Sequence, residues 1–392
     1  MNTNHALKFN PHVAAAPIYV GGATIEAIQK QYGLEHVIKM ASNESPLGPS
    51  PQAVEAIQKA ALMLNRYPPM GDEDFRNVLA GAIGQGMTAG NFVTGNGGCD
   101  ILAMIAANFL QPGDECVIAR PTFPVYDITA QRAGASVVYA DLHPDTFAYD
   151  VEAMLSAITG RTRLLYVCSP NNPTGTIITA GQMETLVNNA PPHVVIVADE
   201  VYHHFADHTD FPDTLEYVRQ GKNIIVLHSF SKAFGLAGLR LGYAIAPPKL
   251  ARYLSRARES FHLSRLAIVG GMASLDDRAH LQKIVSTSRQ GREWLYRELA
   301  RLGVQVWPSQ SNFVLFKPLC CPGELSEQLL RRGVIVRPMS QFYLPTHLRV
   351  TAGLPEENKR FIAALRESLA ILEERGVPEE APAEASGGEF KF

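Results

Sequence analysis

The side chains best suited to chemistry stand together just after a short apolar run in the middle of the sequence. Ser229, Ser231 and Lys232 follow the run 224–227, and Arg240 comes shortly after them. Hydroxyl and guanidinium groups bind phosphate, while burial and nearby cations lower the pKa of a lysine and free its amine for attack on a carbonyl. A lone lysine is usually solvated, but this cluster predicts a phosphate site beside a reactive amine.

Two further groups of polar side chains follow apolar runs. Asp199 ends the run 194–198 and is followed by Tyr202, and Asn171 and Asn172 come after the run 164–168. The carboxylate either begins a solvated loop or pairs with a cation or a protonated ring nitrogen. The two asparagines, flanked by proline and glycine, either form a turn or face a ligand at the edge of a sheet.

A glycine-rich segment, 94–100, enters a predicted helix, and the free N–H groups of a helix N-terminus bind phosphate. The segment matches neither G-x-G-x-x-G nor a P-loop, which disfavours a Rossmann oxidoreductase and a P-loop nucleotide. An amine, a phosphate site, a partner for a ring nitrogen and an asparagine pair together are what pyridoxal 5'-phosphate requires. We therefore expect this cofactor.

The elements that must position these groups alternate between β-rich runs and helical patterns. Helices are predicted at 98–109, 151–158 and 181–188. Short apolar strands separated by helices indicate an α/β domain with a mostly parallel sheet covered on both faces. The predicted strands are 115–119, 136–140, 164–168, 194–198, 224–227 and 241–246.

After about residue 248 the pattern changes to long helices and short strands, which predicts a smaller α+β domain. The helices are expected at 248–261, 281–302 and 356–375, and the strands at 313–316, 334–336 and 348–350. The expected organisation is an N-terminal arm and part of the small domain (1–45), a large cofactor-binding domain (46–255), the small C-terminal domain (256–376) and a disordered tail (377–392).

Composition excludes several classes of protein. The chain has 392 residues, of which 46% are hydrophobic, and its formal net charge is −3, so it lacks the basic excess of a bulk nucleic-acid binder. No apolar run approaches the roughly 18–20 residues of a membrane span, and the N-terminus has no secretory signal pattern. Five cysteines without a C-x-x-C pair argue against a disulfide framework or a zinc site. We expect a cytoplasmic protein without nucleic-acid or membrane partners.

One metal hypothesis also arises from the sequence. His203, His204, Asp207 and His208 form a dense cluster in which His204 and His208 have the spacing of one helix face. Because the cluster directly follows Tyr202, we interpret it as a polar surface loop and predict no metal site.

As a set, these motifs resemble the fold-type I pyridoxal-phosphate aminotransferases, most closely the histidinol-phosphate aminotransferase group. The resemblance covers about residues 16 to 372 and rests on the motifs at 41–49, 66–68, 121–123, 169–175, 199–202, 229–232 and 348–350. It implies an aspartate-aminotransferase-like large domain, with a mostly parallel central sheet flanked by helices, and a smaller α+β domain. It also implies a homodimer with shared active sites.

The resemblance also implies roles for individual residues. Lys232 would form the internal aldimine and move the proton during a ping-pong reaction, and Asp199 would pair with the pyridine nitrogen. Arg349 would bind the substrate carboxylate, and Tyr67 would reach the cofactor of the neighbouring subunit. The other cofactor-binding residues would be Gly98, Cys99, Phe123, Asn172, Tyr202, Ser229, Ser231 and Arg240.

The resemblance further implies a substrate. Tyr19 and Arg337 match places at which the group binds the substrate phosphate, and Asn43 is also assigned to substrate binding. Arg337 could otherwise be a solvated strand end. We therefore predict transamination between histidinol phosphate and 2-oxoglutarate in histidine biosynthesis. The alternatives on the same framework are an aromatic amino-acid aminotransferase of the phenylalanine type and a threonine-phosphate decarboxylase.

Three segments depart from the group's usual pattern. Gly98 and Cys99 stand where the group often has Ser-Asp or Ala-Asp, the segment 259–264 lacks the usual asparagines, and 340–344 replaces a glycine-containing turn. The last two are expected on the substrate side of the site.

A transcriptional regulator on the same framework would carry an added DNA-binding domain, for which this chain has no room.

Overall fold

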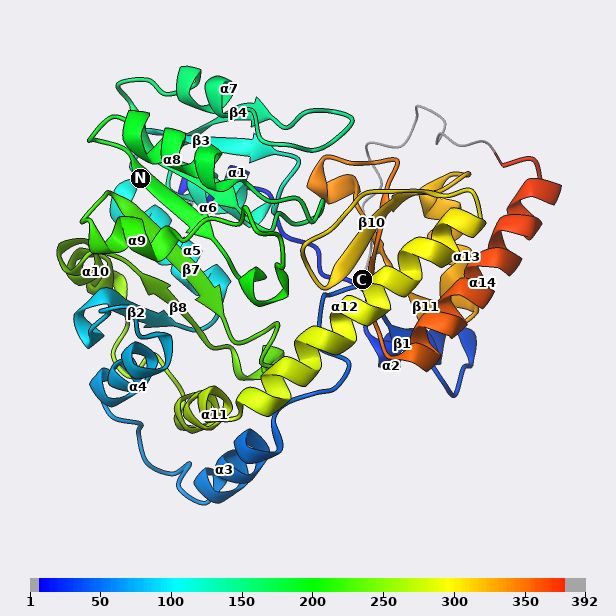
Figure 1. Cartoon of the computed structure of the whole chain (residues 1–392), viewed down its shortest axis with the longest axis horizontal. Coiled ribbons are helices and arrows are strands. Elements are labelled where there is room, and N and C mark those ends of the chain that lie inside the picture. Colours follow the sequence, from blue (N-terminus) through cyan, green and yellow to red (C-terminus); the bar gives the residue numbers. More distant parts are fainter. Residues whose placement is uncertain (1–6, 378–392) are drawn as a thin grey trace, which may run out of the picture.

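Two larger sheets, a two-stranded sheet and their covering helices make up the computed structural model, which describes residues 7–377 (Figure 1). The larger sheet has seven strands in the order β2-β8-β7-β6-β5-β3-β4. Only β8 runs antiparallel to its neighbours, which confirms the predicted α/β class with a mostly parallel central sheet. Its strands are β2 (Phe92–Gly95), β3 (Glu115–Arg120), β4 (Ser136–Asp141), β5 (Thr162–Cys168), β6 (Val195–Asp199), β7 (Ile224–Ser229) and β8 (Gly242–Ile245).

Both faces of this sheet are covered, because alternate strand residues point to opposite sides. Leu164 and Tyr166 of β5 belong to the hydrophobic cluster under α5, α6 and α10, whereas Leu165 and Val167 belong to the cluster under α4, α8, α9 and α11. Because both sides of these strands are buried, each strand appears in the sequence as a continuous run of apolar residues. The helices around the sheet are α3 (Pro51–Ala61), α4 (Glu73–Ile83), α5 (Gly98–Phe109), α6 (Val125–Arg132), α7 (Val151–Ser156), α8 (Ala180–Asn189), α9 (Thr214–Arg219), α10 (Pro248–Leu254) and α11 (Arg265–Asp276).

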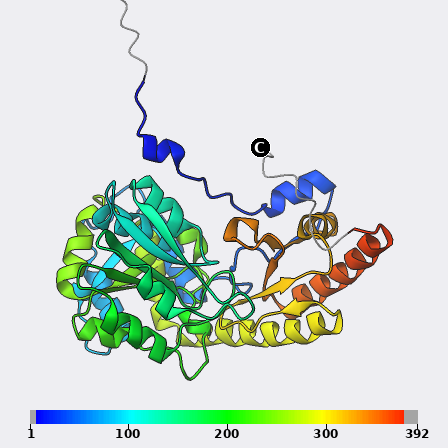
Figure 2. The same cartoon turned by 90° about the horizontal axis from the view of Figure 1, so that it is seen from above.

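A four-stranded antiparallel sheet, ordered β12-β13-β10-β9, forms the second layered unit. Its strands are β9 (Gln305–Val306), β10 (Phe313–Lys317), β12 (Arg337–Pro338) and β13 (Leu348–Thr351), and its helices are α12 (Arg278–Arg301), α13 (Pro322–Arg331) and α14 (Pro355–Glu374). Helix α12 is the long yellow helix that runs from one unit to the other (Figures 1 and 2).

The N-terminal residues lie against this second unit. Strand β1 (Ile38–Lys39) pairs in parallel with β11 (Val334–Ile335), and Ile28 of α2 (Ile25–Tyr32) packs on Ile335. The first helix, α1 (Pro11–Ala15), instead contacts α6 of the large sheet, so the segment between α1 and α2 passes from one unit to the other (Figure 2).

The structure corrects several predicted elements. The helix expected at 248–261 ends at Leu254, and a new helix, α11, begins after Ser264, whose hydroxyl accepts a hydrogen bond from the Ala267 N–H. Phe261 between them has a positive φ of 55°, which no helix allows. The strand expected at 334–336 ends at Ile335 as β11, and a separate strand, β12, begins at Arg337 in a different sheet.

Val377, the first residue of the predicted disordered tail, is ordered in the structure. Val377 is partly buried against the cluster that includes α14, and its N–H donates to the carbonyl of Leu372. The rest of the predicted tail lies outside the described residues. Within residues 7–377, no helix is both long enough and apolar enough to cross a membrane.

Candidate active site

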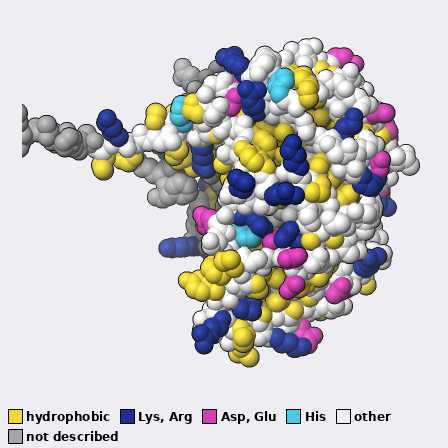
Figure 3. Space-filling model, turned by 90° about the vertical axis from the view of Figure 1, so that its left-hand side faces the viewer, with side chains coloured by type: hydrophobic (Ala, Val, Ile, Leu, Met, Phe, Trp, Pro, Cys, Tyr) yellow, Lys and Arg dark blue, Asp and Glu magenta, His cyan; other side chains and the backbone are white. Residues whose placement is uncertain are grey.

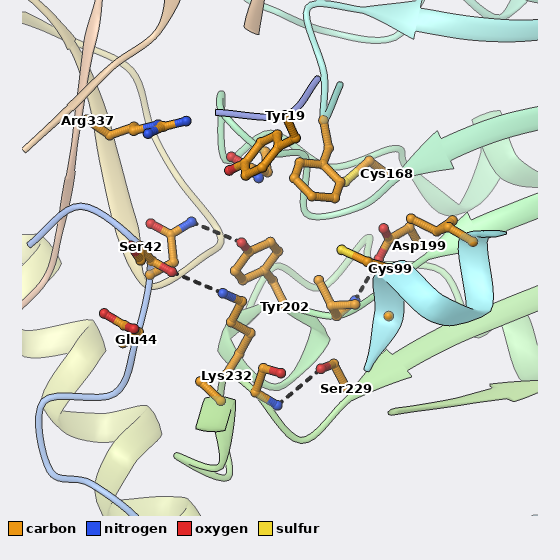
Figure 4. A pocket seen from close by; sticks show the side chains of 18 of the residues that line it. Tyr19, Ser42, Glu44, Cys99, Cys168, Asp199, Tyr202, Ser229, Lys232 and Arg337 are labelled. Atoms are coloured by element: carbon orange, nitrogen blue, oxygen red, sulfur yellow. Dashed lines mark hydrogen bonds between the residues drawn. The ribbon is translucent and has the colours of Figure 1, made fainter. Parts of the chain in front are cut away.

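A cavity of about 400 Å³ lies where the carboxyl ends of β2, β5, β6 and β7 meet the second sheet (Figure 4). In open α/β sheets this edge is where ligands bind. Its lining includes every predicted site residue except Tyr67, namely Tyr19, Asn43, Gly98, Cys99, Phe123, Asn172, Asp199, Tyr202, Ser229, Ser231, Lys232, Arg240, Arg337 and Arg349. Residues separated by more than 300 positions in the sequence therefore share one cavity.

Lys232 lies just beyond the end of β7, with its amine directed into the cavity. The Nζ atom donates to the carbonyl oxygen of Ser42 at 3.1 Å and lies 5.7 Å from the centre of the Tyr202 ring. Burial, with a smaller contribution from the Arg349 charge, lowers the pKa of Lys232 to about 8. A substantial fraction of this amine is therefore neutral, and thus nucleophilic, near physiological pH.

Asp199 ends β6 on the opposite side of the cavity and is 3% exposed. Its Oδ2 accepts a hydrogen bond from the Tyr126 hydroxyl at 2.6 Å, and its Oδ1 accepts from the Val201 N–H at 3.2 Å. Burial is the larger effect and raises the pKa of Asp199 to about 6, although the Tyr126 hydrogen bond opposes it. A protonated ring nitrogen placed here would gain an ionic partner in a dry environment.

Tyr126 is a site residue that sequence analysis missed. Its place three positions after Phe123, on the helix that follows the 121–123 motif, was the available signal. The Phe123 ring lies between Tyr126 and Tyr19, with centroids 5.8 and 6.0 Å away in edge-to-face geometry. Phe123 is thereby fixed as one wall of the cavity.

The predicted phosphate site lies at the N-terminus of α5. Gly97 has φ 84°, and a Cβ atom on it would lie 2.4 Å from an Arg240 guanidinium nitrogen, so only glycine fits. That guanidinium is 3.5 Å from the Ser231 hydroxyl, and Ser229 Oγ accepts the Ser231 N–H at 3.1 Å. Free helix N–H groups, two hydroxyls and an arginine thus surround one end of the cavity.

The other end of the cavity holds two arginines on neighbouring strands. Arg337 of β12 is the direct partner of Arg349 on β13 in the antiparallel register, so both side chains lie on the same face. The Arg349 guanidinium donates to Asn172 Oδ1 and, at 2.7 Å, to the carbonyl of Ala41, while its buried Nε has no partner. Burial lowers the pKa of Arg349 to about 10.

Arg337 is 8% exposed, so it is not the solvated strand end that the sequence left open. One guanidinium nitrogen donates to the Val20 carbonyl at 2.6 Å, and the group lies 5.7 Å from the Tyr19 ring. Tyr19 and Arg337 therefore lie together in the lining of the cavity (Figure 4), and Arg349 lies beside Arg337 on the neighbouring strand.

Asn43 and Tyr202 form a pair on the cavity wall. The Asn43 amide donates to the Tyr202 hydroxyl at 2.9 Å, and its own Oδ1 accepts from Thr351 at 3.2 Å. Asn43 has a positive φ of 55°, a conformation that asparagine tolerates better than most residues. This geometry lets Asn43 orient the Tyr202 hydroxyl.

The two adjacent asparagines have different surroundings. Asn171 is fully buried, accepts the Thr122 hydroxyl at 2.7 Å, and donates to the Pro121 carbonyl at 2.9 Å and to Thr174 at 2.8 Å. Asn172 instead lines the cavity and contacts Arg349. Asn171 therefore stabilises the turn, and Asn172 faces the cavity.

Tyr67 lies outside the cavity of its own chain and is 79% exposed. Its ring stacks on Phe261 with the centroids 4.7 Å apart, and Arg265 donates to its carbonyl at 2.9 Å. The side chain is therefore held on the surface, where its predicted role toward a neighbouring subunit would place it.

The histidine cluster is not the polar surface loop that we predicted. The His203 ring stacks on His228 and lies beside His204, with centroids 3.8 Å away in each case, because the short helix His203–Phe205 turns both rings inward. Of the four residues in the cluster, only Asp207 and His208 are exposed. Among residues 7–377, no group of three or more His, Cys, Asp or Glu side chains is arranged to hold a metal ion.

Comparison with known proteins gives a consistent set of relatives. The family model Aminotransferase class I and II matches residues 35–365. The histidinol-phosphate aminotransferase of Moorella thermoacetica is 42% identical over 353 residues, which cover 90% of each chain. That of Symbiobacterium thermophilum is 39% identical over 351 residues, covering 90% of this chain and 96% of that protein.

Solved structures agree in fold. The crystal structure of histidinol-phosphate aminotransferase from Sinorhizobium meliloti, in complex with pyridoxal-5'-phosphate, has a TM-score of 0.84 and 25% identity, covering 94% of this chain and 99% of that chain. A single mutant of Thermus thermophilus aspartate aminotransferase has a TM-score of 0.80 and 25% identity, covering 94% and 100%.

The two adjacent asparagines allow a comparison between two variants, one at the buried turn and one at the cavity. Asn171→Ala should lower the free energy of unfolding by about 2–3 kcal/mol, because it leaves two buried hydroxyls and a carbonyl without their partner. Asn172→Ala should stay within about 1 kcal/mol of the wild type yet weaken pyridoxal phosphate binding about tenfold. Urea unfolding and cofactor titration measure the two effects. A loss of cofactor binding in Asn171→Ala at unchanged stability would contradict the assignment.

The buried carboxyl of Asp199 predicts a pH-dependent stability for the protein without cofactor. Burial raises the pKa of Asp199 to about 6 in the folded chain, whereas an aspartate in the unfolded chain has a pKa of about 3.9. Above about pH 4 the unfolded chain is therefore increasingly favoured by the ionisation of Asp199, and the penalty is complete above about pH 6. Asp199→Asn should therefore be more stable than the wild type by up to about 3 kcal/mol at pH 8, and equal to it near pH 4. Urea unfolding at pH 4, 6 and 8 checks this, and a pH-independent difference would refute it.

Proposed function

The chain belongs to the class I and II aminotransferases, and we propose that it transfers an amino group between histidinol phosphate and 2-oxoglutarate. The main support for this substrate is the strand register, which places Arg337 beside Arg349 on one face of β12 and β13. One arginine is needed for a carboxylate such as that of glutamate, and the second supplies the cation that a phosphate requires. The curated relatives named above support the proposal by their names.

Pyridoxal 5'-phosphate is the cofactor that the family implies, and the cavity fits its chemistry. An amine, a buried carboxylate and a phosphate-binding helix end surround one cavity, while the Arg349 Nε is buried without a partner. When bound, the cofactor supplies an electron-withdrawing ring that makes the Cα proton of an amino acid acidic.

Each residue of the site would then have a role that follows from its position in the cavity. Lys232 would hold the cofactor through Nζ and afterwards carry the proton to and from the substrate Cα, for which its lowered pKa of about 8 is suited. Asp199 would keep the ring nitrogen protonated, and Asn172 and Tyr202 would bind the ring hydroxyl. Gly98, Cys99, Ser229, Ser231 and Arg240 would bind the cofactor phosphate, and Phe123 would cover the ring face.

We also propose that two copies of the chain form the working enzyme, in the cytoplasm. Large hydrophobic side chains are exposed on the N-terminal segment, among them Phe9 and Ile18, and between α3 and α4, among them Leu62, Tyr67 and Met70. Figure 3 shows hydrophobic side chains on the projecting segment and gathered toward the bottom of the face in view. Apolar exposure of this extent marks an interaction surface. Burial against a second copy would bring the exposed Tyr67 within reach of the partner's cavity.

A second candidate function has its own support in the cavity. Tyr19 presents an aromatic ring on the substrate side, and this ring would stack on a benzene ring as well as on an imidazole. An aromatic amino-acid aminotransferase therefore remains the alternative, with threonine-phosphate decarboxylation as the third reaction on this framework.

A single-turnover screen separates these reactions. The cofactor-loaded enzyme is mixed with histidinol phosphate, phenylalanine, threonine phosphate or glutamate, and conversion to the pyridoxamine form is followed by absorbance. Histidinol phosphate and glutamate should convert the cofactor fastest. Faster conversion by phenylalanine than by histidinol phosphate would replace our substrate with the aromatic alternative.

Arg337 provides the residue-level test. Arg337→Ala should raise KM for histidinol phosphate about 10- to 100-fold, since a charge-assisted bond to the phosphate is lost. Turnover of unphosphorylated histidinol should change much less, and Arg337→Lys should restore part of the preference for the phosphorylated substrate. An equal loss of activity with both substrates would show that Arg337 does not recognise the substrate phosphate.

A further inference from the structure

The turn 339–344, between β12 and β13, joins the second sheet to the large one. It contains the segment that departs from the glycine-containing turn of the family, and it carries Phe342 and Tyr343. Its side chains contact α6 and β4 of the large sheet, far away in sequence.

A single buried carboxylate makes this contact. The Tyr343 hydroxyl donates to Asp127 Oδ2 at 2.5 Å, and the Tyr139 hydroxyl donates to the same oxygen at 2.6 Å. Gln131 donates to the other oxygen, and Asp127 is only 8% exposed. Hydrogen bonds to an ionised carboxylate are about twice as strong as neutral ones. Of these bonds, the one from Tyr343 ties different units of the molecule together.

Arg120 covers the pair of phenol rings. Its guanidinium carbon lies 4.4 Å from the centre of the Tyr139 ring and 5.7 Å from that of Tyr343. Two hydrogen bonds to Asp141, of 2.7 and 3.0 Å, hold the guanidinium in that place. The Tyr343 side chain is therefore fixed at both its hydroxyl and its ring face.

The backbone of Tyr343 is in a conformation that a tyrosine adopts at a cost. Its φ is 64°, in the left-handed region, where the Cβ atom of an L-residue costs about 1–2 kcal/mol and glycine costs nothing. A tyrosine held there at this cost points to a function of its side chain. The hydrogen bond to Asp127 is the contact that glycine could not make.

The turn also supports the substrate-side arginines. Phe342 is buried next to Tyr343 and lies 6.4 Å from the Phe123 ring across the cavity wall. The guanidinium carbons of Arg337 and Arg349 lie 5.9 and 5.5 Å from the centre of the Phe342 ring. A shift of the turn away from α6 would therefore move the surface on which both guanidinium groups rest.

We propose that Tyr343 and Asp127 are positioning residues that fasten the turn 339–344 to α6 and so set where Arg337 and Arg349 meet the substrate. The proposal rests on the proposed function in so far as these two arginines bind the substrate. Tyr139 shares the carboxylate but belongs to the large sheet, so its hydrogen bond does not join the two units.

Tyr139 is accordingly the matched control for Tyr343. Tyr343→Phe should raise KM for the amino-acid substrates about tenfold and leave kcat within about twofold, as expected for lost positioning of binding groups. Tyr139→Phe, which removes a hydrogen bond to the same oxygen, should leave both constants within about twofold. An unchanged KM in Tyr343→Phe, or an equal rise in Tyr139→Phe, would overturn the proposal.

Tyr343→Gly separates positioning from folding. Glycine relieves the backbone cost, so the melting temperature should be equal to or above that of Tyr343→Phe, while KM rises as much as in Tyr343→Phe. A Tyr343→Gly enzyme with the wild-type KM would show that the hydrogen bond positions nothing.

Hydrogen exchange tests the fastening without any substrate. The Phe342 and Leu344 amides are hydrogen-bonded to the Met339 carbonyl at 2.8 and 3.1 Å. Their exchange is measured in the cofactor-loaded enzymes. In Tyr343→Phe, but not in Tyr139→Phe, these amides should exchange at least several-fold faster. Unchanged exchange would refute the fastening, whereas a wild-type enzyme that rejects histidinol phosphate would refute only the proposed function. The kinetic comparison would then use the amino acid that the wild type accepts.

Discussion

Repulsion among cations that line one cavity is the constraint on which the site depends. Lys232, Arg240, Arg337 and Arg349 line one cavity, and within residues 7–377 none of them forms an ion pair with a carboxylate. Burial and the neighbouring arginine charge lower the pKa of Lys232, and burial lowers that of Arg349. Such an arrangement is stable only when it is offset by anions, and a phosphorylated cofactor and an anionic substrate are suitable ones.

The scaffold meets this constraint by keeping the cations on separate rigid elements. Lys232 follows β7, Arg240 precedes β8, and the other two arginines stand on paired strands of the second sheet. Because β8 runs antiparallel to β7, its beginning lies at the same edge as the end of β7. Carbonyl groups of Ser42, Ala41 and Val20, from the N-terminal segment, accept the hydrogen bonds of three of these cations.

The N-terminal segment therefore has a chemical role as well as a structural one. It passes between the two units, adds β1 to β11, and delivers carbonyl oxygens, which are neutral partners for buried cations. A carboxylate in the same place would neutralise the cations and compete with the anionic ligands. Neutral acceptors satisfy the donors and leave the positive charge available.

Much of the site was readable from the sequence, because short motifs placed directly after apolar strands must gather at one sheet edge. The roles of Lys232, Asp199 and Asn172 stay proposals, but their meeting in one cavity followed from that rule. Helix α11 was missed because its start depends on a single capping serine. Tyr126 and the turn 339–344 act through contacts between segments distant in sequence, which no local pattern encodes.

The sequence by itself determined the class of fold, the order of the strands along the chain and the chemical groups available, since hydrophobic periodicity and motif spacing are local properties. Only the tertiary structure decided which of two adjacent asparagines faces the cavity, that Arg337 is buried beside Arg349, and that the histidine rings turn inward. Those outcomes depend on strand register and on burial between segments far apart in the chain, and both are set by packing rather than by neighbouring residues.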